Sequence, residues 1–280
     1  MRRPLVVSFS GGRTSAFMSW WIKENIKERP VHYVFANTGQ EHERTLEFVD
    51  RCDREWGLGV VWLEAEVHHG ERRGTTYRVV DFDSAAREGQ PFEEVIRKYG
   101  IPNRSYPHCT RELKLAPINT WAKDCCGPDR DMAVGIRADE IDRMQADYKE
   151  KQIVYPLIQW ISTDKRAVNR FFESQSFDLD LPPLLGNCTW CWKKTLRKHL
   201  TLLNTCPEIY DFPERMEAEY ADAGAGDESR VFFRQRKSTR DLRLLATEPF
   251  TPWTDEYQPE LFSEWDIPDG CAESCEVTFE

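Results

Sequence analysis

The sequence has no apolar run long enough to cross a membrane. A membrane-spanning helix needs roughly 18 or more consecutive apolar residues, and no stretch of this chain approaches that length. Near the start, only Leu5, Val6 and Val7 follow one another before Ser8. Such a run is too short for the apolar core of a secretory signal peptide. We therefore expect a cytoplasmic protein without a membrane partner.

Two common nucleotide-binding signatures are also missing. The chain has neither the Gly-x-x-x-x-Gly-Lys-Ser/Thr loop nor a Gly-x-Gly-x-x-Gly fingerprint, which disfavours a P-loop kinase or GTPase. It contains no internal repeat, and its 280 residues suit one large domain or one domain with an appendage.

Positive charge is in deficit over the whole chain but is gathered in two places. With 38 basic and 48 acidic residues, the formal net charge of −10 argues against a protein that coats nucleic acid over its entire surface. A local basic face for DNA or tRNA stays open. The basic segment Arg230–Arg243, which flanks Phe232 and Phe233, could bind a phosphate backbone. Alternatively, it could be a solvated face with two core phenylalanines. The two segments are Lys193–Lys198 and Arg230–Arg243.

Apolar periodicity predicts an α/β fold. Short apolar runs alternate with amphipathic helical patterns, which is typical of parallel βαβ units in a doubly wound sheet. We expect this α/β domain to span residues 1–180, and residues 181–280 to form a cysteine-containing region of helices and loops. The expected strands are 5–10, 31–36, 59–63 and 132–135, and the expected helices are 14–27, 45–56, 91–99, 168–174 and 192–204.

The loop Ser10–Ser15 lies where the first strand ends and the first helix begins. Unpaired amides and the helix dipole favour an anion at such a place, and Gly11 and Gly12 let the backbone approach it closely. Hydroxyl groups come from Ser10, Thr14 and Ser15, and Arg13 adds a guanidinium group. The alternative is a glycine turn with an N-cap serine, but the flanking strand and helix favour anion binding.

Six segments with distinctive residues follow one another along the chain. They are Ser10–Ser15, Phe35–His42, His108–Pro117, Val134–Glu140, Tyr155–Trp160 and Gly186–Cys191. With these segments the chain resembles the PP-loop ATP pyrophosphatases, and most closely the phosphoadenosine phosphosulfate reductase-like family, which also includes DNA phosphorothioation proteins and many phage proteins. The resemblance covers about residues 4 to 210, and the order of the motifs makes it specific.

The resemblance implies a Rossmann-like sheet of the adenine nucleotide alpha hydrolase-like type, with helices on both faces. Such proteins cleave ATP between the α- and β-phosphates with Mg²⁺, place AMP on a substrate oxygen, and let a nucleophile, often sulfur, displace it. Thr14 departs from the family pattern, which most often has Asp there. Reductases of the family often lose the second glycine or the loop serines, so the complete loop here favours ATP as the ligand.

The resemblance also assigns roles to residues. Arg137 is expected to contact phosphate or substrate, the alternative being a structural arginine. Asn37 is expected at the adenosine edge, the alternative being a strand-end turn residue. The nucleotide-binding residues are expected to be Ser8, Ser10, Gly11, Gly12, Arg13, Thr14, Ser15, Asn37, Thr38 and Gly135, and the catalytic residues Arg13, Arg137 and Cys109.

Nine cysteines are many for a reducing compartment, where a disulfide framework is unusual and clustered thiols more often bind metal. Cys188 and Cys191 have the spacing of a chelate pair. Cys109 is the third ligand that the resemblance implies, and Cys206 is the nearest sequence candidate for a fourth. We expect a [4Fe-4S] cluster, with zinc or plain buried thiols as alternatives.

The other cysteines carry weaker expectations. Cys125 and Cys126 resemble the paired cysteines of assimilatory reductases only superficially, so we expect them not to be ligands. Cys52 falls on the apolar stripe of a helix and is expected in the core. Cys271 and Cys275 lie near the end of the chain, where a redox or persulfide-carrying role is open.

Three functions follow as hypotheses. The first is an ATP pyrophosphatase that adenylates a substrate oxygen and supports iron–sulfur-dependent sulfur transfer to nucleic acid, with a cysteine desulfurase or another sulfur donor as partner. The second is a thioredoxin-dependent reductase of phosphoadenosine or adenosine phosphosulfate. The third is a nucleotide-binding regulatory module without turnover. A homo-oligomer is compatible with all three.

Overall fold

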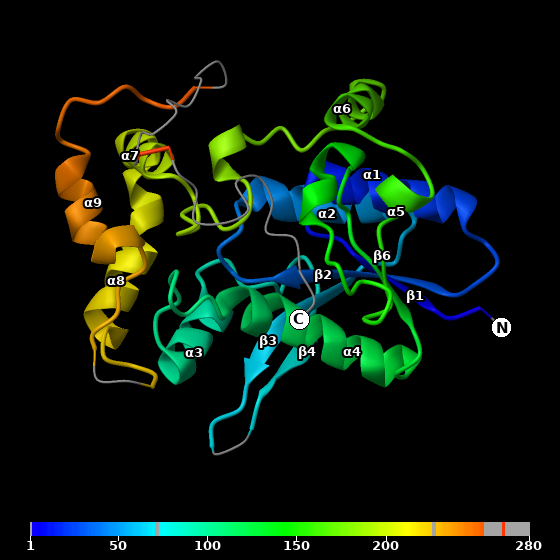
Figure 1. Cartoon of the computed structure of the whole chain (residues 1–280), viewed down its shortest axis with the longest axis horizontal. Helices are drawn as coiled ribbons and strands as arrows, with labels where there is room; N and C mark the ends of the chain where they lie inside the picture. The colour runs from blue at the N-terminus through cyan, green and yellow to red at the C-terminus, as the bar shows by residue number, and fades with distance from the viewer. Residues whose placement is uncertain (1, 71–72, 226–227, 255–264, 267–280) are drawn as a thin grey trace.

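Strand β1 (Leu5–Ser8) lies in the centre of a six-stranded sheet with the order β4-β3-β2-β1-β5-β6. Its side chains alternate between two cores, because Leu5 and Val7 pack on one face and Val6 on the other. The computed structural model describes residues 2–70, 73–225, 228–254 and 265–266 (Figure 1). The other strands are β2 (Val31–Asn37), β3 (Val61–Val67), β4 (Thr75–Val80), β5 (Asp131–Ala133) and β6 (Ile153–Val154).

All strand pairs of this sheet are parallel except β3–β4, which is antiparallel at the edge. Helices cover both faces, as Figure 1 shows. One core joins the sheet to α1 (Arg13–Asn25), α2 (Glu43–Trp56), α5 (Pro156–Gln159) and α6 (Lys165–Glu173). The core on the other face joins it to α4 (Ala116–Cys126), which follows a π-helical turn at Arg111–Leu115.

A third core connects the end of β3 and helix α3 (Gln90–Tyr99) with the C-terminal helices. Trp190 and Phe232 are fully buried in it, and their rings meet edge to face at 4.8 Å. The C-terminal helices are α7 (Leu196–Thr205), α8 (Asp211–Tyr220) and α9 (Thr239–Leu245). The proposed division into 1–180 and 181–280 stays a prediction.

The strand order creates a crevice beside β1. The chain passes from β1 to β2 on one side, whereas β5 pairs with β1 on the other. Ligands of open α/β sheets bind at such a switch point, outside the carboxyl ends of the strands. The loop Ser10–Ser15 after β1 and the segment Val134–Arg137 after β5 therefore arrive at the same place.

The predicted α/β class is confirmed, with differences in detail. The sequence pattern did not reveal β4, β6, α4, α8 or α9. The helix expected at 192–204 begins only at Leu196, because the Thr195 side chain accepts a hydrogen bond from the Lys198 amide and caps the helix there. Within the described ranges, none of the helices has the length and apolar character that crossing a bilayer demands.

Candidate functional site

The hydroxyl group of Ser15 holds the loop after β1 in shape. Its Oγ accepts hydrogen bonds from the Ser10 amide at 3.1 Å and from the Ser10 Oγ at 3.0 Å, and donates to the Gly12 carbonyl at 3.0 Å. These bonds fold the loop over the start of α1. The N-cap is Gly12, whose missing side chain leaves no acceptor for the first-turn amides. Those amides are the donors that an anion at a helix N-terminus uses.

The two glycines of the loop have different reasons to be glycine. Gly11 has φ +79°, and a Cβ there would lie 2.6 Å from the Thr45 Cγ2 of α2. The loop thus packs directly on α2, and a side chain at this position would force the loop or Thr45 to shift. A Cβ on Gly12 would meet only the Ser10 Oγ at 3.9 Å. Gly12 therefore leaves open space where a phosphate could approach the backbone.

The loop forms one wall of a cavity of about 800 Å³, a volume in the usual range for small-molecule sites. The other walls come from the 179–187 segment, the start of α6 and the stretch between Cys191 and α7. Seven cationic side chains and two carboxylates line it, which gives the cavity a local positive excess in an acidic protein. They are Arg13, Arg44, Arg137, Lys165, Lys193, Lys194 and Lys198 against Glu140 and Asp180.

Arg137 reaches this cavity from the end of β5. It is 9% exposed, and its Nη1 donates to the Thr14 Oγ1 at 2.9 Å, so Thr14 ties Arg137 to the start of α1. Its Nε donates to the Asp139 Oδ1 at 2.9 Å. Burial raises the pKa of Asp139, but the hydrogen bond and charge of Arg137 outweigh it and hold that pKa below its usual value. Arg137 is thus fixed in the cavity wall rather than lying on the surface.

Arg13 also lines the cavity and spans its two sides. Its Nε donates to the Asp178 Oδ1 at 2.6 Å, and its second nitrogen pairs with the other carboxylate oxygen. Asp178 precedes the segment Leu179–Pro182, which forms the facing wall. The ion pair therefore connects the loop after β1 with the chain that closes the cavity.

Gly135 and Ser8 do not line the cavity. A Cβ on Gly135 would lie 3.3 Å from the Ser15 Cα, so the chain after β5 approaches α1 closely there. Ser8 is buried at the end of β1. Their predicted contact with the nucleotide stays a prediction.

Asn37 is engaged inside the fold. Its Nδ2 donates to the Glu64 Oε1 at 2.7 Å and to the Ala86 carbonyl at 2.8 Å, and its Oδ1 accepts from the Gly39 amide at 3.1 Å. The side chain is completely buried. This arrangement favours the alternative that Asn37 shapes the turn at the strand end.

Cys109, Cys188 and Cys191 line a second, smaller cavity, which we call the thiol recess. Its volume is about 20 Å³, close to what one water molecule needs. Thr38 lines this recess rather than the larger cavity, and its Oγ1 lies 3.5 Å from the Cys188 Sγ. Burial, reinforced by Glu41, raises the pKa of the Cys188 thiol well above its ordinary value.

Two charged residues beside the recess were not among the expected site residues. Glu41 is buried, and its Oε2 accepts from the Thr38 amide at 2.9 Å and the Thr38 Oγ1 at 2.8 Å. Its Oε1 lies 3.9 Å from the Nζ of Lys114, which is also buried. Both residues lie in segments that carry the family resemblance, Phe35–His42 and His108–Pro117. These segments could have identified the two residues from the sequence.

Cys191 belongs to both cavities, and so does Lys193. The predicted thiol site and the predicted nucleotide site are therefore adjacent. Cys206 lies at the C-terminal end of α7, a helix of 10 residues and so about 15 Å long. It lines neither cavity, and the structure does not bring it to the other three cysteines. Cys271 and Cys275 lie outside the described residues.

The three thiols of the recess are the candidate ligands for the expected metal group. In a tetrahedral zinc site with Zn–S bonds of about 2.3 Å, the sulfur atoms stand about 3.8 Å apart. In the described part of the chain, the sulfur atoms of Cys109, Cys188 and Cys191 are not all within 4.8 Å of one another. A single zinc ion bound by all three thiols would therefore require them to move closer together, and the [4Fe-4S] cluster stays a prediction.

Side chains of the second basic segment, Arg230–Arg243, are buried or bind other residues of the protein. Phe232 and Phe233 are buried in the third core, as the alternative interpretation expected. Arg230 donates to the Tyr99 carbonyl at 2.9 Å and lies over the Tyr106 ring. The remaining paired arginines meet carboxylates: Arg236 with Glu228, Arg240 with Glu214, and Arg243 with Asp211 and Glu214.

Comparison with known proteins gives relatives in phages and archaea. Residues 4–81 match the model of the phosphoadenosine phosphosulfate reductase domain. The chain is 30% identical to the uncharacterized nin region protein ORF290 of Escherichia phage lambda, over 97% of this chain and 94% of that protein. It is 25% identical to the uncharacterized protein MJ0066 of Methanocaldococcus jannaschii, over 79% of this chain but only 43% of that longer protein.

Among solved structures, the chain is similar to the phosphoadenylyl-sulfate (PAPS) reductase from Candida auris in its phosphate complex. The TM-score is 0.38 at 14% sequence identity, and the match covers 60% of this chain and 71% of that chain.

Proposed function

We propose that this chain, which belongs to the phosphoadenosine phosphosulfate reductase-like family of the PP-loop ATP pyrophosphatases, is itself an ATP pyrophosphatase. The family consists of nucleotide-binding, sulfur-related enzymes. The chain cleaves ATP between the α- and β-phosphates and places AMP on an oxygen of its substrate. Sulfur then replaces that oxygen. The observation that carries this proposal is one cavity, walled on one side by the complete loop Ser10–Ser15 and on the other by Cys191.

The phosphate-binding wall supplies the first half of the reaction. The amides at the start of α1 and the open space at Gly12 receive the phosphate groups. Arg137, held by Thr14, and Arg13 stabilise the negative charge that develops on the departing pyrophosphate. Mg²⁺ is bound mainly by phosphate oxygens and water. The carboxylates of the lining, Glu140 and Asp180, already pair with arginines, Glu140 with Arg143 and Asp180 with Arg44.

The thiol side of the cavity supplies the second half. Cys109, Cys188 and Cys191 are the residues that would hold an iron–sulfur cluster, with Lys193 and Lys114 nearby to offset thiolate charge. Such a cluster, when bound, supplies an iron position that binds sulfide. The sulfur comes from a donor such as a cysteine desulfurase, and a thiol reductant, which becomes a disulfide, converts the persulfide of the donor to sulfide. A sulfur nucleophile attacks the activated centre, and AMP leaves with the substrate oxygen.

We propose a nucleic acid as the substrate, because its phosphate backbone complements the lining of the cavity. The cations outnumber the carboxylates there although the whole chain has a net charge of −10. Trp253 adds an aromatic ring beside the cavity, with the Lys198 Nζ 5.0 Å from its centroid. A groove that combines cations with aromatic rings is typical of single-strand nucleic-acid binding.

The test is a product assay with the purified protein and ATP labelled in the α- and γ-phosphates. We expect AMP and pyrophosphate, formed faster when DNA or tRNA and a sulfur donor are present. ADP and inorganic phosphate as the products would contradict α–β cleavage.

Two other outcomes separate the alternatives. Release of sulfite from phosphoadenosine phosphosulfate with thioredoxin, and no pyrophosphate from ATP, identifies a reductase. Binding of ATP without any product identifies a regulatory module. In an anaerobic preparation, the Cys188→Ser variant should lose the colour of an iron–sulfur cluster, and the Cys206→Ser variant, matched in chemistry but outside the recess, should keep it.

A further inference from the structure

A second group of metal-binding side chains lies outside the site described above. One ring nitrogen of His32 and the sulfur atoms of Cys125 and Cys126 all lie within 4.8 Å of one another. His32 is on β2 in phase with Val34 and Ala36, so it faces the α4 layer. Cys125 and Cys126 are the last two residues of α4. The fold thus brings a histidine next to two cysteines that lie about ninety residues further along the chain.

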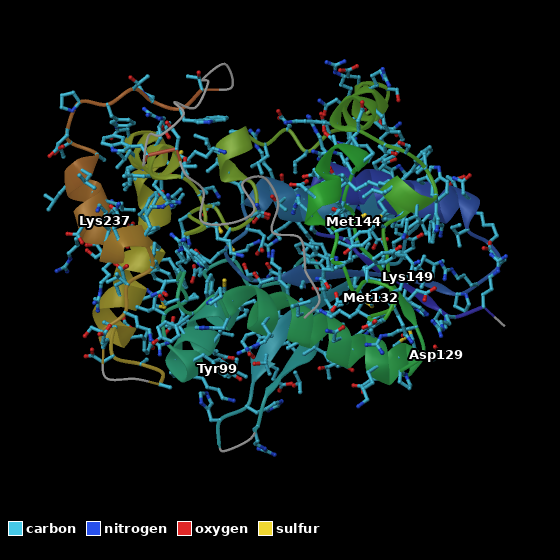
Figure 2. All side chains as sticks on the ribbon, viewed as in Figure 1. Tyr99, Asp129, Met132, Met144, Lys149 and Lys237 are labelled. Carbon is cyan, nitrogen blue, oxygen red and sulfur yellow. The ribbon has the colours of Figure 1, made fainter. Side chains whose placement is uncertain are left out.

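This group is far from the thiol recess. Helical structure runs without a break from Cys109 to Cys126, and at 1.5 Å per residue this segment is about 25 Å long. Cys109 is at its first residue, beside the recess, and Cys126 is at its last. Figure 2 places Asp129, three residues beyond the helix end, on the side of the molecule away from Tyr99 and Lys237. The two groups of sulfur atoms therefore serve separate sites.

The donor set selects a particular class of metal ion. Two thiols and an imidazole are soft to borderline ligands that favour Zn²⁺ over Mg²⁺ or Ca²⁺. Two Cys and one His with a fourth position left open is an established ligand set for zinc. Tetrahedral zinc needs about 3.6–3.8 Å between its donor atoms, so a separation of up to 4.8 Å requires only rotamer-scale adjustment.

The surroundings hold the donors in place without closing the site. The His32 ring packs edge to face against Trp121, with centroids 5.9 Å apart. Cys125 is exposed, which leaves solvent access to the fourth position.

We propose that His32, Cys125 and Cys126 bind a Zn²⁺ ion with its fourth position open to solvent. The ion ties the first half of β2 to the end of α4. The proposal departs from the expectation that Cys125 and Cys126 are not ligands, which was made for the site of Cys109, Cys188 and Cys191. The proposal does not depend on the reaction at the nucleotide cavity.

The test is a titration of reduced, metal-free, full-length protein with Co²⁺, followed by competition with Zn²⁺. We compare the wild type with the Cys125→Ser/Cys126→Ser variant, and use His69→Ala, which removes an exposed histidine elsewhere, as the matched control. The wild type and the control should each bind one equivalent more than the double variant. The thiolate-to-cobalt charge-transfer absorption of that equivalent should disappear with the two cysteines, and Zn²⁺ should displace the cobalt.

A second variant keeps the test decisive if the double variant unfolds. His32→Asn preserves both thiols, and loss of one ligand should weaken the additional Co²⁺ site at least tenfold. Circular dichroism establishes that each variant is folded. Equal metal equivalents in the wild type and a folded Cys125→Ser/Cys126→Ser variant would overturn the proposal. An unchanged affinity in a folded His32→Asn variant would overturn the role of the histidine.

Discussion

The two basic regions of this protein differ in what their cations face. Around the larger cavity, seven cationic side chains share the lining with two carboxylates, and Asp178 and Asp139 pair with Arg13 and Arg137 from outside the lining. In the segment 230–243, three arginines face carboxylates of α8 and of a neighbouring loop, as Arg240 does with Glu214 and Arg236 with Glu228. A similar density of lysine and arginine thus gives a positive cavity in one place and a neutralised surface in the other.

This difference shows why basic runs in a sequence are weak predictors of ligand binding. Exposed ion pairs such as Arg236–Glu228 contribute little to stability, but they cancel the charge that would attract a phosphate. The cavity keeps a positive excess because its seven cations outnumber the two carboxylates of the lining and the two, Asp178 and Asp139, that pair with cations from outside it. The following predictions test this contrast, beginning with the largest expected effect.

Replacing Arg137 should have the largest effect. The Arg137→Ala variant removes a buried guanidinium group from the phosphate wall, and we expect kcat/KM for pyrophosphate release to fall about 100-fold. Arg170→Ala, which removes an exposed arginine of α6, should leave the rate within a factor of two. A loss of less than threefold in Arg137→Ala would contradict the proposed difference between the two basic regions.

Gly11→Ala should destabilise the fold most among the loop variants. Its Cβ would lie 2.6 Å from the Thr45 Cγ2, so overpacking adds to backbone strain, and we expect a loss of about 2–3 kcal/mol in the free energy of unfolding. Gly57→Ala also has a positive φ, +58°, but meets nothing within 4 Å, so it should lose about 1 kcal/mol. Urea denaturation measures both, and equal losses would refute the packing argument.

Gly12→Ala should affect binding rather than stability. The added methyl group meets only the Ser10 Oγ, at 3.9 Å, so the free energy of unfolding should change by less than about 0.5 kcal/mol. The methyl group does occupy the space beside the first-turn amides, and we expect the Kd for ATP to rise about tenfold, or about 1.4 kcal/mol. Calorimetric titration measures this, and an unchanged Kd would place the phosphates elsewhere.

The smallest effect should separate the two basic regions directly. Lys193 lines the cavity, so Lys193→Ala should weaken single-stranded nucleic-acid binding several-fold and lower the salt slope of log K by about 0.7. Arg240→Ala removes a cation that Glu214 already neutralises, and its affinity and salt slope should match the wild type. The reverse result would assign nucleic-acid contact to the C-terminal segment.

The central part of the sheet could be predicted from the sequence because each strand and helix there has a full apolar stripe. Strand β4 could not be predicted, since it is an edge strand whose residues are mostly half-exposed and its pattern depends on pairing with β3. Helix α4 was concealed by Pro117, which normally ends a helix. Here Pro117 lies in the first turn of α4, and the π-helical turn at Arg111–Leu115 carries the chain into it.

The site was predicted in part. The loop Ser10–Ser15 and Arg137 carry local motifs, and both line the cavity. The actual surroundings of Asn37 and Thr38 could not be read from the sequence, because their partners Glu64 and Cys188 are distant along the chain. The same applies to His32, whose proximity to Cys125 exists only in three dimensions.

The central step of the proposed reaction is the transfer of AMP to a substrate oxygen. The most direct measurement is to run the reaction in H₂¹⁸O with ATP, the nucleic-acid substrate and a sulfur donor, and to analyse the products by mass spectrometry. If AMP is transferred to the substrate, AMP and pyrophosphate should both be free of ¹⁸O, because the oxygen that AMP carries away comes from the substrate. One ¹⁸O atom in either product would mean that water is the acceptor, and would contradict the proposed transfer.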